Sequence, residues 1–254
     1  MKRLIVTGDD FGISPKVNAE IERFHREGLL TQASLMVNGD ALEEAVRIAR
    51  RNPGLTVGLH LALCDAKGSA VSALTDARRN LIPSPARAGL RYAFDRRLRD
   101  ALEKEIESQF ERFLTLGFSP AYWDGHTHLH LHPTVLRMSL PAASKGGFGF
   151  TRLVREPKPA RPVPLVFHGL SRAAIPKLRD RGITYADQVY GLSETGAMDM
   201  PSFSRIVASL GDGWSELYFH PGVDGADIEA ARLLEQIRQG GVILSAAGRS
   251  SPSA

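Results

Sequence analysis

The sequence has little cysteine and no long apolar run. Cys64 is the one cysteine among 254 residues, so an intrachain disulfide is excluded and a reducing compartment fits the composition. No stretch reaches the roughly 20 apolar residues of a membrane-spanning helix. The apolar run at residues 4–6 is shorter than the about 7–15 apolar residues of a signal peptide. We therefore expect a cytoplasmic protein.

Neither sign of charge dominates the chain. Lys and Arg number 32 against 28 Asp and Glu, and both signs are interspersed. The resulting net charge of +4 does not indicate a nucleic-acid-binding protein. Zinc-finger spacing, a P-loop and a dinucleotide-binding glycine motif are also absent. With 43% hydrophobic and 24% charged residues, the composition is that of a globular protein and excludes a disordered chain.

Short apolar runs alternate with stretches whose apolar residues recur at helical spacing. The longest helical stretch is 98–113, and another, 227–239, lies between the last two apolar runs. This alternation predicts parallel β/α architecture. We expect one distorted TIM-like α/β barrel of about seven strands over residues 1–248, with residues 249–254 as a flexible tail. The predicted strands are 4–6, 33–37, 55–63, 121–124, 216–220 and 242–245.

Polar side chains lie at the ends of several predicted strands. Asp9 and Asp10 follow the first strand, His60 lies in the third, and His220 ends a late one. Loops after the strands build the active sites of such barrels, so these side chains are candidates for one site. The alternatives are ordinary: a helix cap for the two aspartates and a core position for each histidine. Cys64 lacks an activating partner in the sequence and is expected to be a small buried residue.

Four histidines alternate over seven positions, at His126, His128, His130 and His132. In an extended segment they would share one side, about 6.6 Å apart. In a helix near Pro133, His128 and His132 would form an i, i+4 pair. Either geometry predicts metal binding, while a third interpretation has one or two histidines as ligands and the others packed or hydrogen-bonded. The roles of the last three stay open at this level.

Mixed carboxylate and imidazole groups are typical ligands of Zn, Mn, Fe, Co or Mg. Such a metal activates a water molecule and polarises a carbonyl group. A free carboxylate nearby can take the proton of that water. The residues thus predict metal-assisted hydrolysis of an amide or ester. A phosphoesterase and a non-catalytic sugar-binding barrel are the alternatives.

Five motifs lie at or near the ends of the predicted strands: TGDDFG at 7–12, SLMVNG at 34–39, VGLH at 57–60, DGHTHLH at 124–130 and FHPG at 219–222. Together they resemble the YdjC-like (ChbG/HpnK) carbohydrate deacetylase family, in the expected order over roughly residues 3 to 245. Gly8 stands where this family often has Ala, and the Gly-rich stretch 145–150 also departs from its pattern.

The resemblance implies a distorted TIM-like barrel related to polysaccharide deacetylases. It implies a metal-dependent enzyme that removes an acetyl group from an N-acetylated sugar. By the same resemblance, Asp10, His60 and His126 hold a divalent metal ion, Mg or Zn, Asp9 is the general base, and His220 is the acid that protonates the leaving amine.

Two segments, 88–99 and 130–135, resemble the hopanoid-associated HpnK branch more than the chitooligosaccharide branch. That branch implies a glycolipid substrate, an acetylglucosaminyl hopanoid, with a chitooligosaccharide as the alternative. The Arg-rich stretch Arg87–Arg99, with Leu90, Tyr92 and Phe94, is either a peripheral contact to the inner membrane or an ordinary solvated helix. The oligomeric state stays open.

Overall fold

The centre of the molecule is a curved, wholly parallel β-sheet of seven strands. The computed structural model describes residues 1–157 and 161–247, so the predicted tail lies outside the described residues. The hydrogen-bonded order is β4-β3-β2-β1-β6-β5, and β7 pairs with β1. The strands are β1 (Lys2–Phe11), β2 (Gln32–Leu35), β3 (Thr56–Leu61), β4 (Trp123–Gly125), β5 (Gln188–Tyr190), β6 (Gly213–Phe219) and β7 (Val242–Ser245).

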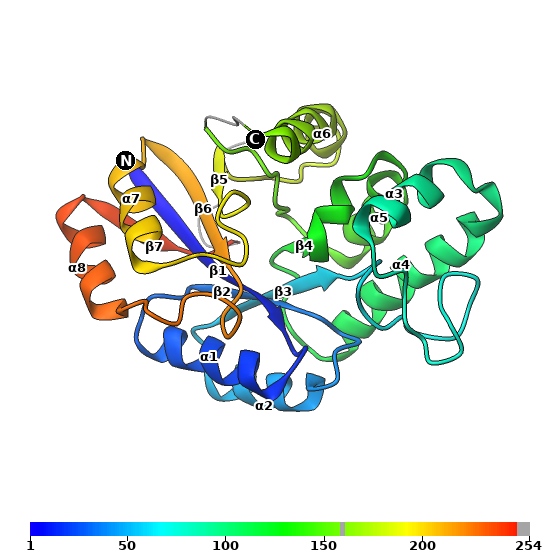
Figure 1. Cartoon of the computed structure of the whole chain (residues 1–254), viewed down its shortest axis with the longest axis horizontal. Helices are drawn as coiled ribbons and strands as arrows, with labels where there is room; N and C mark the ends of the chain where they lie inside the picture. Colours follow the sequence, from blue (N-terminus) through cyan, green and yellow to red (C-terminus); the bar gives the residue numbers. More distant parts are fainter. Residues whose placement is uncertain (158–160, 248–254) are drawn as a thin grey trace.

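Helices surround this sheet, with α1 and α2 on one side, α3 to α5 on another, and α7 and α8 on a third (Figure 1). None of the helices in the described part of the chain is long and apolar enough to cross a membrane. The helices are α1 (Pro15–Arg26), α2 (Leu42–Arg51), α3 (Pro85–Phe94), η1 (Arg96–Leu98), α4 (Arg99–Thr115), η2 (His126–Leu131), α5 (Pro133–Gly146), α6 (Pro162–Arg179), α7 (Met200–Ser209) and α8 (Ala230–Gln239).

Strand β1 is the central strand of the sheet. Leu4, Ile5 and Val6 are fully buried, as the continuous apolar run of a two-sided strand requires. One edge of β1 pairs with β6, and the other pairs first with β7 and then with β2. Because every strand is parallel, the carboxyl ends of β1, β3, β4 and β6 meet at one edge of the sheet.

An irregular segment spans the gap between β4 and β5. Thr151 pairs with Trp123, the first residue of β4, and Phe150 pairs with Thr184. This segment therefore runs parallel to the sheet and brings Arg152 to the same edge as the carboxyl ends of the strands. The curved sheet is a half-barrel, which confirms the predicted distorted TIM-like α/β fold.

The sequence pattern located most strands but missed shorter or less regular elements. β5 has only three residues, too few for a recognisable alternation. The sequence pattern does not predict α6 and α7, and it offers α3 and α5 only as alternatives, a solvated helix over Arg87–Arg99 and a helix near Pro133. Each of these four helices has proline in its first turn. Proline fits this position because the first helical N–H groups have no intrahelical partner, so these prolines mark helix starts.

Candidate metal centre

Two carboxylates at the end of β1 approach the same histidine. In a regular strand, Asp9 and Asp10 would point to opposite faces. The pairing of β1 with β2 shifts register between Gly8 and Phe11, and Asp10 has a left-handed backbone with φ of 63°. Each aspartate thereby belongs to a group of side chains whose possible ligand atoms lie within 4.8 Å of one another, and His60 is common to both groups.

Asp10, His60 and His126 form the first of these groups. Asp10 Oδ1 lies 2.9 Å from His126 Nδ1 and 3.3 Å from His60 Nε2. The two imidazole rings lie edge to face, with centroids 5.7 Å apart. Asp10 and His60 are buried, and His126 is partly exposed, so one side of the group is open to a ligand. Three strand ends thus bring together the three residues predicted as metal ligands.

Asp124 binds the ring nitrogen of His60 that faces away from Asp10. His60 Nδ1 donates to Asp124 Oδ1 over 2.6 Å, which leaves Nε2 directed at Asp10. The Ser34 hydroxyl donates to the second oxygen of Asp124. Burial lowers the pKa of His60, but the carboxylates of Asp124 and Asp9 raise it to about 10. Since a carboxylate partner orients metal-binding histidines in many proteins, Asp124 has the position of such a partner.

A fully buried guanidinium, Arg152, fastens the remaining carboxylates. Its two terminal nitrogens donate to Asp9 over 2.7 and 2.9 Å, the bidentate arrangement that arginine favours. Its Nε donates to Glu216 over 2.9 Å, and Nη2 lies 2.9 Å from Asp124. The guanidinium also stacks over the ring of Tyr218, 4.3 Å from its centroid. Arg152 therefore fixes three acidic side chains from three different strands.

The charge balance of this cluster fits a divalent cation. Four carboxylates, those of Asp9, Asp10, Asp124 and Glu216, are buried together with the guanidinium of Arg152 and with His60, whose raised pKa favours its protonated form. The carboxylates still outnumber the positive groups, and a cation bound at Asp10 and His60 would displace the proton of His60. Buried charges are costly unless they are paired. Burial favours the neutral form of Asp10, but hydrogen bonds from the two histidines hold its pKa well below the ordinary value. A carboxylate and two imidazoles are a donor set that Zn²⁺ commonly takes, with open positions left for water and substrate.

The second group, Asp9, His60 and Asp124, is a weaker candidate for a cation. Asp9 already accepts hydrogen bonds from Arg152, and Asp124 forms an ion pair with the same guanidinium. His60 also uses Nδ1 for Asp124. The geometry therefore favours one cation at Asp10 over a pair of cations of the kind that phosphoesterases often use.

His220 follows β6 at the same edge of the sheet. Its ring Nδ1 lies 3.7 Å from Asp224 Oδ2, and its backbone N–H donates to Asp224 Oδ1 over 2.9 Å. Burial lowers the pKa of His220, but Asp224, Asp9 and Asp10 together raise it above the ordinary value. The negative charges of Asp224, Asp9 and Asp10 therefore stabilise the protonated form of the His220 ring.

The histidine run adopts neither of the two predicted geometries. Residues 126–131 form the 3₁₀ helix η2, and Thr127 and His128 within it have left-handed backbones, with φ of 54° and 58°. The run is therefore not extended and does not present its histidines on one side. His128 and His132 are not an i, i+4 pair either, because α5 begins only at Pro133 and His132 precedes it.

Each histidine of the run contacts a different part of the molecule. His126 alone contacts Asp10, which agrees with the interpretation that a minority of the run bind metal. Burial lowers the pKa of His128 well below its ordinary value and that of His130 to about 4, so both rings are neutral. The partners of the other three are the Tyr218 hydroxyl for His128, the Arg152 carbonyl for His130, and the Thr134 backbone N–H for His132.

Residues 3–243 match a family described as YdjC-like protein. The chain belongs to the YdjC-like family. This confirms the family resemblance found in the five motifs, whereas the HpnK branch stays a prediction.

Curated relatives of this YdjC-like chain carry the name carbohydrate deacetylase. The mouse protein is 33% identical over 87% of this chain and 78% of its own length, and the human protein is 31% identical over 87% and 75%. The protein of Brevibacillus brevis is 38% identical, but the match covers 56% of this chain and 56% of that protein. The chain therefore matches just over half the length of this bacterial relative.

Solved structures share the fold at low sequence identity. A protein described as a candidate cellobiose-phosphate cleavage protein from Enterococcus faecalis has a TM-score of 0.70 at 18% identity, over 96% of this chain and 97% of that chain. A lactam utilization protein from Thermus thermophilus has a TM-score of 0.54 at 16% identity, over 97% and 100%. At these identities the likeness supports the fold alone.

Arg152 is the main residue of the YdjC-like site that the sequence did not suggest. It follows an irregular segment rather than a strand with a clear pattern. One signal was present: a single arginine interrupts the apolar stretch from Phe150 to Val154, where an unpaired charge would be costly. Glu216 begins the predicted strand that ends at His220, but nothing in the sequence predicts its contact with Arg152. Cys64 is fully buried, as expected.

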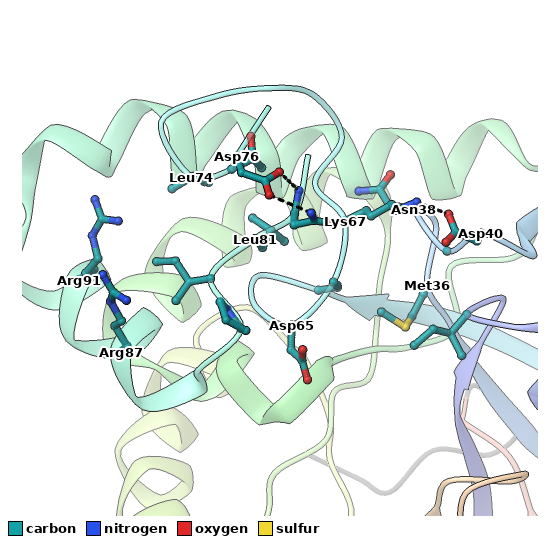
Figure 2. Close-up of a pocket in the computed structure, with 18 of the residues that line it drawn as sticks. Met36, Asn38, Asp40, Asp65, Lys67, Leu74, Asp76, Leu81, Arg87 and Arg91 are labelled. Atoms are coloured by element: carbon teal, nitrogen blue, oxygen red, sulfur yellow. Dashed lines mark hydrogen bonds and ion pairs between the residues drawn. The ribbon is translucent and has the colours of Figure 1, made fainter. Parts of the chain in front are cut away.

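A pocket of about 710 Å³ is lined by residues of the segments that follow β1, β2 and β3 and by residues of α3. Its walls include Ile13, three residues after Asp10, and Ala62, two residues after His60. Figure 2 shows Met36 and Asn38 at one end of the pocket and Arg87 and Arg91 at the other. The loop that follows β3 forms much of its wall, so the pocket extends from the segment after β2 to the start of α3.

Proposed function

We propose that the chain is a metal-dependent hydrolase that removes an acetyl group from an N-acetylated sugar. The observation that carries the proposal is the convergence of Asp10, His60 and His126, with possible ligand atoms within 4.8 Å, beside the clamped carboxylate of Asp9. The names of the curated relatives support an N-acetylated sugar as the substrate.

In this proposal Asp10, His60 and His126 hold a divalent metal ion, Zn²⁺ or Mg²⁺. When bound, such an ion polarises the amide carbonyl and makes water more acidic. Asp9 takes the proton of the attacking water on a carboxylate oxygen, and Arg152 keeps that carboxylate in one orientation. The water oxygen forms the new bond to the carbonyl carbon.

His220 completes the reaction as the acid. Because its Nδ1 faces Asp224, its Nε2 is the nitrogen that gives a proton to the leaving amine. The carbon–nitrogen bond then breaks, and acetate and the free amino sugar are the products.

For the substrate we propose a glycolipid, an acetylglucosaminyl hopanoid, on the resemblance of segments 88–99 and 130–135 to the HpnK branch. A pocket of about 710 Å³ is in the range of small-ligand sites and leaves space for a sugar. A chitooligosaccharide is the alternative substrate, and relative kcat/KM values for the two substrates distinguish between them.

The test is acetate release from N-acetylglucosamine conjugates, together with metal content by elemental analysis. We expect one bound metal ion per chain and loss of activity after chelation. Asp10→Asn should lose both the metal ion and at least about 10³-fold in activity, since the reaction depends on activated water. Asp212→Asn, an exposed aspartate at the opposite edge, is the matched control and should retain both. Full activity of the metal-free protein would contradict the proposal.

A further inference from the structure

Helix α3 presents one face on which arginine and large apolar side chains alternate. Arg87, Leu90, Arg91 and Phe94 are spaced i, i+3, i+4 and i+7, so they lie together on one side of the helix. Leu90 is 63% exposed and Phe94 is 79% exposed. Two large apolar side chains on one outward face are a feature of surfaces that contact a partner.

The opposite face of α3 is fastened to the protein. Ala88 and Tyr92 are buried there, and the Tyr92 hydroxyl donates to the Leu63 carbonyl over 2.7 Å. Ser84 caps the first turn through the backbone N–H of Arg87. This anchoring sets the rotation of the helix, so Leu90 and Phe94 cannot turn inward without breaking it.

The charge around the exposed face is positive. Arg96 and Arg97 follow the helix, and Asp95 is the single acidic residue of the segment 85–99. Asp95 is already paired, 2.9 Å from Arg97 and 3.6 Å from Arg91. Apolar side chains flanked by arginine match the boundary between the acyl chains and the anionic headgroups of a bilayer. We propose that this face of α3 docks on an anionic lipid surface.

A second copy of the chain and a different protein partner fit the exposed face of α3 less well than a lipid surface does. A second copy of the chain related by a twofold axis would bring the same arginines against each other, because such an interface uses the same patch on both subunits. A protein partner generally needs about 20–30 residues a side, whereas this face offers two apolar side chains and a few arginines.

Docking on α3 would place the pocket at the lipid surface. Arg87 and Arg91 belong to the exposed face and also line the pocket, whose other end lies at Met36 and Asn38 (Figure 2). A sugar carried on a membrane lipid would then enter the pocket while its apolar part stayed in the bilayer. This consequence rests on the proposed function, but the docking itself does not.

The experiment is co-sedimentation of the full chain with vesicles of phosphatidylcholine, with or without phosphatidylglycerol. We expect binding to the anionic vesicles that weakens as salt is added, and little binding to the neutral ones. The double variant Leu90→Ser/Phe94→Ser should bind anionic vesicles at least about tenfold more weakly. The matched control is Leu165→Ser/Val166→Ser, an exposed apolar pair on α6, which should bind as the unmodified chain does.

Three outcomes would overturn the proposal: no binding to anionic vesicles, undiminished binding by Leu90→Ser/Phe94→Ser, or an equal loss in the α6 variant. Thermal melting followed by circular dichroism shows that both variants are folded. Acetate release from a soluble substrate is measured separately. Acetate release without vesicle binding contradicts only the docking proposal, whereas vesicle binding without acetate release contradicts only the proposed function.

Discussion

A buried carboxylate is costly unless a positive charge or a hydrogen-bond donor compensates it. In the candidate metal centre, different carboxylates have different partners. Arg152 compensates Asp9, Asp124 and Glu216, while Asp10 has only the imidazoles of His60 and His126. The two neighbours in the sequence thus differ in chemistry because their partners differ. Asp9 is held by the permanently charged guanidinium of Arg152, whereas Asp10 has the position that we propose for a metal ligand.

One residue-scale prediction concerns Asp224, which faces His220. Asp224 helps to raise the pKa of His220 above its ordinary value. Asp224→Asn removes that negative charge, so the pKa of His220 should fall and the acid should lose its proton at lower pH. The alkaline limb of the pH profile of kcat/KM should therefore move to lower pH by about one unit. Asp212→Asn should leave the profile unchanged, and an unshifted limb in Asp224→Asn would argue against His220 as the acid.

At the scale of elements, short irregular segments rather than long helices orient the side chains of the candidate metal centre. The register shift in β1 brings Asp9 and Asp10 toward one histidine. The left-handed residues of η2 separate His126 from the histidines that follow it, so that His128 and His130 become neutral core residues. β3 and β4 pair His60 directly with Asp124.

Close packing between β3 and the residue before β4 predicts a sensitive position at Gly58. A Cβ atom there would lie 2.5 Å from Tyr122 Cε1, a rigid buried ring atom. Gly58→Ala should lower the free energy of unfolding by about 1–3 kcal/mol and also reduce activity, since His60 lies two residues away. Thermal unfolding measures the change.

The matched control for Gly58 is Gly169 in α6, an exposed position where no atom lies within 4 Å of an added Cβ. Gly169→Ala should raise the free energy of unfolding by roughly 1 kcal/mol, because alanine favours the helix. Equal stability of Gly58→Ala and the unmodified chain would mean that the contact between β3 and Tyr122 is looser than described.

At the scale of the whole molecule, the candidate centre joins strands from both halves of the chain. Residues from β1, β3, β6 and the segment before α6 meet there, up to 209 positions apart in the case of Thr7 and Glu216. A cation bound at such a junction stabilises the folded state because the unfolded chain has no assembled site for it.

This linkage predicts a metal-dependent melting temperature. At a free metal concentration of about 100 times Kd, stability should rise by about 2.7 kcal/mol, or about 5–10 °C in Tm for a chain of this size. Differential scanning calorimetry with Zn²⁺, Mg²⁺ or a chelator measures the shift. Asp10→Asn should show no shift and Asp212→Asn a normal one. An equal shift in both variants would place the metal elsewhere.

The sequence alone determined the alternation of strands and helices, the family, and which polar side chains stand at strand ends. Those properties follow from local hydrophobic pattern and from motifs, which need no knowledge of distant contacts. Tertiary structure decided the rest: that His126 meets Asp10 while His128 and His130 do not, and that Arg152 closes the cluster. The physical reason is that a buried charge or ring takes its role from partners that lie far away in the chain and become neighbours only when the sheet curves.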